Sequence, residues 1–426
     1  MKWDAIILGG GAAGLAAAKI LSDAGCTVLI IEARQRIGGR ILTLTNSKFN
    51  LPIELGAEFI HGNPPSTWKL VYEAGLAALD LPFAHKQLRR GRLVDLDTDD
   101  ELSQVMGGLA HLGKRDISFA EYLRHHHGGS AEARKFAVSF VESFDAADPE
   151  IISAKSIAAE QQGVGDVENE TQFRLLGGYK SLVDFLQRSC DPKRVKLQLN
   201  TPITEIHWRK SSVELRSADS HRFTAKRALI TLPLGILRNP SAVRFIPEIP
   251  QWRQYASQLA FGTVVKAVLR FREPFWEGDK NLRDAVFIHD WQAKFPTWWT
   301  ARPLRIPILT AWAGGPKAQA LAGLSRAQTL RAAIDSLSKL VHRSPRQLTA
   351  LMDQFLYCDW SADPYARGAY SYVAVGGSRA RSYLAKPIAG TLYFAGEALD
   401  TSGQASTVAG ALTSGERAAT RLLRDL

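Results

Sequence analysis

The feature that most constrains the fold is a glycine-rich turn near the start of the chain. An apolar run ends at Leu8 and is followed by Gly-Gly-Gly-Ala-Ala-Gly, residues 9–14. A second apolar run then covers residues 27–31. This order predicts a buried strand, a tight turn, a helix and a second parallel strand. The amides and dipole at the helix N-terminus would then bind the diphosphate of a dinucleotide.

Each glycine has a separate part in this turn. Gly9 permits the turn, Gly11 lets a pyrophosphate approach the backbone, and Gly14 lets the helix pack closely on the strand. Glu32 follows the second strand, where dinucleotide sites place an acid that accepts hydrogen bonds from a ribose. A glycine-rich turn alone can bind nothing. A turn that follows a strand, opens a helix and is followed by such an acid indicates a dinucleotide, although it does not say which one.

Residues 34–40, Arg-Gln-Arg-Ile-Gly-Gly-Arg, bear on the choice of dinucleotide. They resemble the second half of the extended fingerprint of FAD-dependent amine oxidases and their relatives. The resemblance implies that Arg40 neutralises the FAD diphosphate, and that Gly38 and Gly39 keep the chain close to the cofactor. Without the resemblance, Arg36 could simply be a solvated loop residue.

Length and cysteine content limit the class of protein. A chain of 426 residues is long enough for two or three domains. Its 3 cysteines have neither metal-type nor redox-pair spacing, which favours free thiols in a reducing compartment. The first predicted strand begins at Asp4, so we expect no signal peptide, and no run approaches the ~20 apolar residues of a membrane span. We therefore expect a cytoplasmic protein without a membrane segment.

The net charge of +11 admits two interpretations. A basic protein can bind nucleic acid or an anionic membrane. The basic residues are dispersed, however, and form neither a long block nor a nucleic-acid motif. A generally basic surface with no nucleic-acid partner is the simpler interpretation.

Residues 53–62, Ile-Glu-Leu-Gly-Ala-Glu-Phe-Ile-His-Gly, resemble the segment beside the isoalloxazine in flavin amine oxidases. The ending Ile60-His61-Gly62 is similar to that of polyamine and spermine oxidases. The resemblance implies that His61 faces the substrate cavity. An isolated histidine can equally be structural, so a catalytic role for His61 depends on the resemblance.

The chain from about 100 to 170 is more polar and has helical periodicity. We expect a helical insertion here, acting as a lid over the substrate site. Three consecutive histidines, 125–127, lie in this block. They lack the i, i+4 pairing of a helical metal site, so a solvated helix end is the simpler interpretation, and we expect no metal.

Residues 261–271 read as a strand with Lys266 on one face between Val264 and Val268. Burial of an ammonium between valines is costly without a compensating group. From the residues alone, Lys266 could also extend to solvent from an edge strand. The Gly-Thr-Val-Val-Lys segment looks like the family strand whose lysine holds a water against flavin N5, and the resemblance implies that role for Lys266.

A second long resemblance covers residues 359–375 and is closest to polyamine oxidases and lysine-specific histone demethylases. It implies that Trp360 packs on the flavin and that Tyr370 forms one wall of an aromatic cage around the substrate amine. Ala369 stands where monoamine oxidases have the cysteine that bonds FAD covalently. We therefore expect non-covalent FAD.

The end of the chain completes the resemblance. A predicted strand at 391–396 delivers Glu397 to the ribityl or diphosphate part of the cofactor. A helix predicted over 404–423 would present the amides of Thr407 and Val408 to flavin N1 and O2. Thr407 replaces the second cage tyrosine of monoamine oxidases, which leaves room for a larger substrate.

These assignments define a predicted α/β fold with a Rossmann-like FAD domain and a substrate domain of mixed sheet and helices. The FAD domain would comprise 1–80, 190–240 and 385–426, and the substrate domain 81–189 and 241–384. The predicted catalytic residues are Lys266, Tyr370 and His61, and the predicted pocket residues are His61, Tyr370 and Thr407. The predicted cofactor contacts are Gly9, Gly11, Ala13, Gly14, Glu32, Ala33, Arg34, Gly39, Arg40, Gly56, Ala57, Glu58, Ile203, Trp360, Gly396, Glu397, Thr407 and Val408.

The resemblance implies oxidation of a C–N bond of an amine to an imine, which hydrolyses, while reduced FAD passes its electrons to O2 and gives H2O2. A secondary amine of the polyamine type is favoured. An L-amino acid oxidase or a desaturase of the same fold is the alternative, and would need an arginine for a carboxylate or a greasy tunnel. A protein that binds FAD without catalysis is a third possibility.

Overall fold

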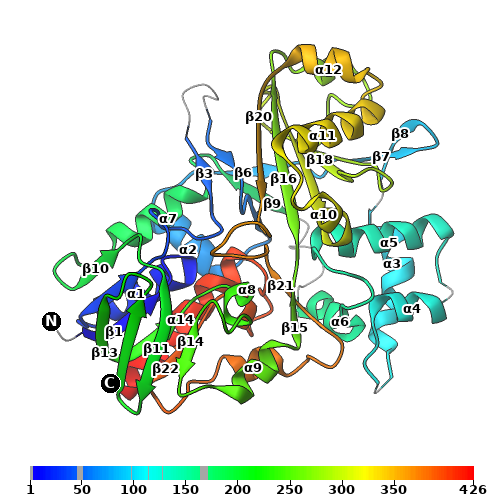
Figure 1. Cartoon of the computed structure of the whole chain (residues 1–426). Helices are drawn as coiled ribbons and strands as arrows, with labels where there is room; N and C mark the ends of the chain where they lie inside the picture. The colour runs from blue at the N-terminus through cyan, green and yellow to red at the C-terminus, as the bar shows by residue number, and fades with distance from the viewer. Residues whose placement is uncertain (1–2, 46–50, 97, 114, 127, 164–170) are drawn as a thin grey trace.

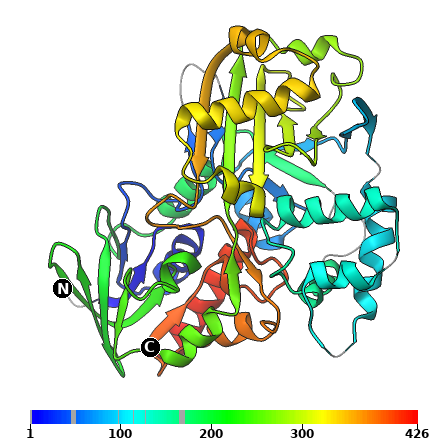
Figure 2. The same cartoon turned by 45° about the vertical axis from the view of Figure 1, so that its right-hand side comes forward.

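The computed structural model describes residues 3–45, 51–96, 98–113, 115–126, 128–163 and 171–426. Two large sheets dominate the arrangement (Figure 1). One lies beside both chain termini, and the other lies at the far end of the molecule. A group of helices stands beside the second sheet, and the turned view in Figure 2 shows the same separation.

The first sheet is built around the N-terminal strand. Its order is β10-β2-β1-β13-β12-β11-β14, and β22 also pairs with β13. Ala5 of β1 lies opposite Val28 on one side and Arg227 on the other, both in parallel pairs. The strands are β1 Trp3–Leu8, β2 Val28–Ile31, β10 Val195–Gln198, β11 Ile203–Arg209, β12 Ser212–Ser217, β13 Arg222–Ile230, β14 Arg244–Ile246 and β22 Leu392–Phe394.

Helices bury both faces of this sheet. Ala5 and Ile7 of β1 pack towards one helical layer, whereas Ile6 and Leu8 pack into the opposite core. The first layer contains α1 Ala12–Asp23, α2 Pro65–Glu73, α7 Tyr179–Arg188 and α14 Val408–Asp425. The second contains α8 Leu234–Leu237, α9 Pro250–Ala256 and α13 Ala380–Leu384. The predicted strand with two buried faces is therefore confirmed.

The second sheet has the order β20-β16-β19-β18-β17-β7-β8. It is mixed, because β17 and β7 are parallel whereas the other pairs are antiparallel. Its strands are β7 His85–Arg89, β8 Arg92–Asp95, β16 Val264–Phe271, β17 Phe287–His289, β18 Thr297–Thr300, β19 Ile308–Gly314 and β20 Met352–Asp359. Packed on it are α10 Gly315–Leu321, α11 Arg326–Leu340 and α12 Pro345–Leu351.

The remaining elements are helices and short strands. The predicted helical region contains α3 Thr98–Met106, α4 Phe119–His125, α5 Ala131–Phe144 and α6 Ala154–Gly163, with a 3-10 turn at Gly107–His111. A three-stranded sheet joins β5 Phe59–His61, β9 Gln172–Leu175 and β6 Ala78–Leu81. Two-stranded sheets pair β3 Thr43–Leu44 with β4 Ile53–Glu54, and β15 Leu259–Phe261 with β21 Ser371–Val373. Further 3-10 turns lie at Phe275–Gly278 and Glu397–Leu399.

The final helix begins later than predicted. It was expected to begin at Gln404, but α14 begins at Val408. Gly403 and Ser406 have φ angles of +88° and +68°, which a right-handed helix does not allow. The hydroxyl of Thr407 caps the helix by accepting a hydrogen bond from the Gly410 N–H over 3.1 Å.

The predicted domain ranges stay a proposal. The contacts favour changes to them: α7 packs with α1, β14 pairs with β11, and α9 and α13 pack in the second core of the first sheet, although all four were grouped with the substrate domain. We propose that α7, α9, α13 and β14 belong with the first sheet. No helix among the described residues is long and apolar enough to span a bilayer.

Candidate functional site

The turn between β1 and α1 has the close contacts that its glycines predict. Gly9 has a φ of +115°, and an added Cβ there would lie 2.6 Å from Oγ1 of Thr231. A Cβ on Gly14 would lie 2.0 Å from the carbonyl oxygen of Gly9. At Gly11, the N-cap of α1, an added Cβ would meet no atom within 4 Å. The helix N-terminus therefore opens on a space that could hold a diphosphate.

Both carboxylate oxygens of Glu32 are bonded at this turn. Oε2 accepts a hydrogen bond from the Gly10 N–H over 2.8 Å, and Oε1 accepts one from the Arg34 N–H over 2.9 Å. Ala33 lies between these residues, and Arg34 forms an ion pair with Asp363. The acid predicted to bind a ribose is thus already oriented by the backbone. Ile203, the predicted adenine contact, is buried at the start of β11.

Arg40 connects the two ends of the sequence. Its Nη1 donates to the carbonyl oxygen of Ala369 over 2.5 Å and to Oε1 of Glu397 over 2.8 Å. The other Glu397 oxygen accepts hydrogen bonds from the N–H and hydroxyl of Ser371, over 3.2 and 2.8 Å. Gly39 precedes Arg40 with a φ of +59°, as a close turn requires. Two predicted cofactor residues, Arg40 and Glu397, therefore form an ion pair.

The segment before β5 lies tightly against Arg40. An added Cβ on Gly56 would lie 1.9 Å from the Arg40 carbonyl oxygen, and the Ala57 N–H donates to that oxygen over 3.4 Å. The Trp360 indole donates to the carbonyl oxygen of Leu55 over 3.0 Å and is buried. The structure thus brings Gly56, Ala57, Trp360 and Arg40 together.

The predicted pocket residues fall into two neighbouring groups. His61 and Thr407 line one small pocket with Tyr179 and Gln404, at the N-terminus of α14. Gly396 precedes this region with a φ of +142°. Ala13 lies in α1, which packs on α14.

Phe144 joins Tyr370 to His61. The Tyr370 hydroxyl donates to the carbonyl oxygen of Phe144 over 2.7 Å. The rings of Phe144 and His61 lie 5.6 Å apart in an edge-to-face arrangement. Burial raises the pKa of Tyr370, and the nearby carboxylates of Asp145 and Glu397 raise it further. Burial lowers the pKa of His61 to about 4, so both side chains are neutral at physiological pH.

Aromatic rings extend from this point in a closed circuit of ring contacts. Each ring contacts the next at centroid distances between 4.5 and 6.4 Å. In order, the rings are Phe59, His61, Phe144, Phe140, Phe136, Trp291, His289, His85, Phe287 and again Phe59. Phe59 and His61 bring this aromatic wall to the small pocket beside Thr407, and aromatic rings attract cationic amines rather than anions.

Lys266 lies on an inner strand, because β16 is flanked by β20 and β19. The alternative of a lysine reaching solvent from an edge strand is therefore wrong. The side chain is 1% exposed. Its Nζ donates to Oε2 of Glu58 over 2.6 Å and to the carbonyl oxygen of Gly56 over 3.2 Å. The compensating group that burial of this ammonium requires is Glu58.

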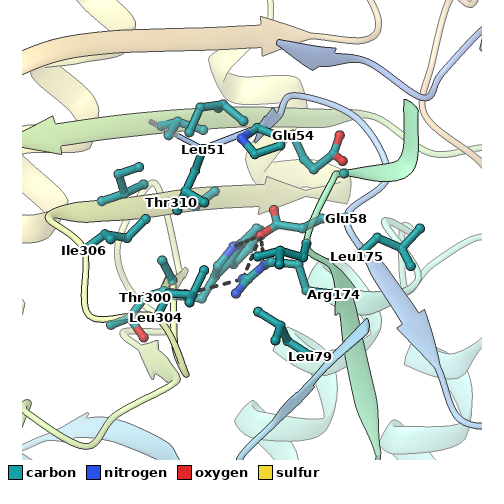
Figure 3. A pocket seen from close by; sticks show the side chains of 18 residues that line it. Leu51, Glu54, Glu58, Leu79, Arg174, Leu175, Thr300, Leu304, Ile306 and Thr310 are labelled. Carbon is teal, nitrogen blue, oxygen red and sulfur yellow. Dashed lines mark hydrogen bonds and ion pairs between the residues drawn. The ribbon is translucent and has the colours of Figure 1, made fainter. Parts of the chain in front are cut away.

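Two further partners of Glu58 were missed from the sequence. Arg174 of β9 donates to Oε1 through Nη2 over 2.8 Å, and Trp299 of β18 donates to the same oxygen over 3.1 Å. Figure 3 shows the Arg174 side chain pointing at Glu58. The only available signal was an arginine within Phe173-Arg-Leu-Leu-Gly-Gly-Tyr179, which does not indicate its partner.

A cavity borders this cluster (Figure 3). Its lining is mainly apolar, but it includes Glu54, Glu58 and Arg174. Burial raises the pKa of Glu54 to about 7, although hydrogen bonds from Thr43 and the Tyr179 N–H oppose this.

His125 ends α4 and His126 follows it, whereas His127 lies outside the described residues. His126 stacks on Tyr122. Within the described part of the chain, no three His, Cys, Asp or Glu side chains converge as a metal site would require. The thiols of Cys26, Cys190 and Cys358 are free.

The residues present fit a flavin dinucleotide. The open cradle at Gly11 suits a diphosphate, Gly38 and Gly39 lie against Gly11 directly before Arg40, and Trp360 offers a buried aromatic surface. The model for flavin-containing amine oxidoreductases matches residues 12–423. The chain belongs to this family. It is therefore an FAD-dependent enzyme that oxidises amines.

Curated relatives match along nearly the whole of this chain. Polyamine oxidase 2 of Arabidopsis thaliana is 26% identical, with 97% of this chain and 86% of that protein covered. The peroxisomal N(1)-acetyl-spermine/spermidine oxidase of Homo sapiens is 28% identical, with 98% and 94% covered. Lysine-specific histone demethylase 2 of Homo sapiens is 25% identical, with 98% and 53% covered.

Solved structures show the same fold. A putrescine oxidase bound to putrescine superposes with a TM-score of 0.84 at 21% identity, covering 100% of this chain and 99% of that one. Cyclohexylamine oxidase from Brevibacterium oxydans superposes with a TM-score of 0.81 at 22% identity, with 100% and 99% covered. The predicted fold class is thereby confirmed.

Proposed function

We propose that this enzyme oxidises a secondary amine of the polyamine type and holds FAD without a covalent bond. The aromatic wall that contains His61, Phe144 and Phe59 carries this proposal, because Phe59 and His61 line the small pocket beside Thr407 and aromatic rings attract a cationic chain. The relatives named as polyamine oxidases support it. Ala369, in place of a cysteine, supports a non-covalent cofactor.

Arginine pairing favours an amine over an amino acid. An amino-acid oxidase needs a guanidinium for the substrate carboxylate. Near the site, Arg40 is paired with Glu397, and Arg174 is paired with Glu58. Arg174 is thus already paired, and Arg40 is assigned to the FAD diphosphate, so neither is left for a substrate carboxylate.

We assign the residues the following parts. The glycine turn, Glu32 and Arg40 bind FAD, and Trp360 packs on it. Tyr370 and His61 orient the amine, and both are neutral, so neither competes as a charge with the substrate nitrogen. Lys266 presents a positive charge at the reactive edge of the site. When bound, FAD accepts a hydride equivalent from the α-carbon of the amine and passes the electrons to O2, which gives H2O2.

The proposal also covers the electron acceptor, the binding partners and the cellular location. O2 is the proposed electron acceptor, and a small-molecule amine is the proposed partner. The dispersed basic residues support a protein without a nucleic-acid partner. The free thiols support a cytoplasmic location.

Anaerobic mixing of the FAD-loaded protein with a panel of compounds tests the substrate. We expect spermidine-like amines to bleach the flavin absorbance, because their secondary nitrogen and extended chain suit the aromatic wall. Bleaching by amino acids alone would favour the alternative of an amino-acid oxidase. Absence of bleaching by every compound would contradict the proposal.

A further inference from the structure

We propose that Glu58 is a positioning residue for Lys266: its carboxylate fixes the ammonium at one point of the site and keeps it charged. The inference rests on the proposed function, because it concerns the lysine assigned to the reactive edge. The resemblance assigned Glu58 to the cofactor. The contacts give the side chain a different partner.

The first step concerns what determines the position of the ammonium. Lys266 is buried and directs two hydrogen bonds to Oε2 of Glu58 and the carbonyl oxygen of Gly56. Its Nζ also lies 5.2 Å from the centroid of the Trp299 ring. A buried ammonium is strongly destabilised without a charged partner. Glu58 is the ion-pair partner of Lys266 among the described residues.

The second step concerns what holds Glu58. Arg174 donates through Nε and Nη2 to Oε1, over 3.1 and 2.8 Å, and Trp299 donates to the same oxygen. The Nη1 of Arg174 is itself bonded to the carbonyl oxygen of Arg302 over 2.9 Å. One carboxylate oxygen is thus held by β9 and β18, while the other faces Lys266. Supporting contacts of this kind fix the geometry of a functional group.

The third step concerns charge. Burial alone would raise the pKa of Glu58, but attraction to Lys266 and Arg174 and their hydrogen bonds lower it overall. The carboxylate therefore stays ionised at neutral pH. It separates two buried cations, which would otherwise repel each other in a site of low polarity. Without it, the ammonium would leave its position or lose its proton.

The reduction potential of bound FAD distinguishes the proposed positioning role of Glu58 from a purely structural role. A positive charge near the flavin favours its reduced form. If Glu58 keeps Lys266 charged and in place, Glu58→Gln should lower the potential, as Lys266→Met should. If Lys266 stays charged and fixed without Glu58, loss of the negative charge should raise the potential. The two explanations therefore predict opposite signs.

The experiment measures this potential at pH 8 in the FAD-loaded wild type, Glu58→Gln, Lys266→Met and the double variant. We expect a lowered potential in Glu58→Gln and no further change when it is combined with Lys266→Met, because residues acting through one another are not additive. A raised potential, an unchanged potential or additive effects would overturn the proposal. The measurement needs no amine. A protein that binds flavin but shows a potential shift of the wrong sign would therefore refute this inference alone. Failure to bind any flavin would refute the proposed function.

Glu54→Gln is the matched control. Glu54 lies in the same cavity wall, and pH 8 is above its pKa of about 7, so both substitutions remove a buried charge. Glu54 accepts hydrogen bonds from Thr43 and Tyr179 and forms none with Lys266. The potential of FAD bound to Glu54→Gln should therefore change much less than in Glu58→Gln. If Glu58→Gln does not fold, Trp299→Phe removes one hydrogen bond to Glu58 and keeps the ring. Trp299→Phe should also lower the potential, by a smaller amount than expected for Glu58→Gln. A raised potential in Trp299→Phe would overturn the proposal as well.

Discussion

At the scale of the residue, the place of Lys266 between two valines could be predicted from the strand pattern, but its burial and its partners could not. Side chains alternate along a strand, so the sequence around residue 266 predicts a lysine between valines. Glu58 lies 208 residues from Lys266, and Arg174 lies 116 residues from Glu58. No periodic pattern connects positions so far apart. Such contacts depend on how the two sheets and the small sheet meet.

Replacement of Lys266 tests the proposed reaction. Lys266→Met keeps the apolar stem but removes the ammonium. We expect flavin reduction or reoxidation to slow by about 10-fold or more, while the FAD content stays unchanged. Rapid-mixing absorbance measurements give both rates, and the visible spectrum gives the FAD content. Unchanged rates in both half-reactions would refute the assigned part of Lys266.

His61 should make stability depend on pH. Its pKa is lowered to about 4 by burial, whereas a histidine in the unfolded chain has a pKa of ~6.5. Between these values the unfolded chain binds a proton that the folded chain does not, so the free energy of unfolding falls as pH falls. The loss at pH 5 should be about 1–2 kcal/mol.

Urea unfolding of the FAD-free protein at pH 7 and pH 5 measures this loss. His61→Asn should reduce the difference between the two pH values. An equal difference in the variant and the wild type would show that His61 is not the group responsible.

At the scale of the element, local signals placed helix starts well where a cap was present. Ser325 and Gln328 have the spacing of a capping box in the sequence, and they form one at the start of α11. The start of α14 was misplaced, because Ser406 has a left-handed φ that its sequence does not indicate. The packing of α14 on α1 was also not predictable, since it depends on Gly415. An added Cβ there would lie 2.2 Å from the Ala13 carbonyl oxygen.

Gly415→Ala should push α14 away from α1. Such overpacking costs about 1–3 kcal/mol of stability, and FAD affinity should fall as well, because both helices begin at proposed cofactor residues. Thermal melting and FAD titration measure the two effects. Gly278→Ala is the control, because an added Cβ there meets no atom within 4 Å. Equal behaviour of the two variants would contradict the proposed contact.

At the scale of the molecule, the sequence predicted the fold class because its specific motifs lie near both ends and at Lys266. The ends meet in one sheet, where β13 pairs with both β1 and β22. The domain boundaries were less predictable than the fold class, because α7 and β14 pack with a sheet formed largely by segments distant from them in the sequence. Domain membership depends on such packing rather than on position along the chain.

The proposed non-covalent FAD leads to a prediction for the whole protein. Acid precipitation should release all the yellow colour into the supernatant, because Ala369 offers no thiol. Removal of FAD should also lower the melting temperature, since a ligand at 100 times its Kd stabilises by about 2.7 kcal/mol. Absorbance of the supernatant and melting with and without FAD measure these effects. Colour in the pellet would contradict the proposal.

The joining of β22 and α14 to the N-terminal sheet has a consequence for biosynthesis. While the ribosome is still translating, β13 lacks its β22 neighbour and α1 lacks the helix that covers it. The nascent chain therefore cannot complete this sheet and its helical cover until β22 and α14 emerge from the exit tunnel. Uptake of the cofactor must then wait for the emergence of these two segments.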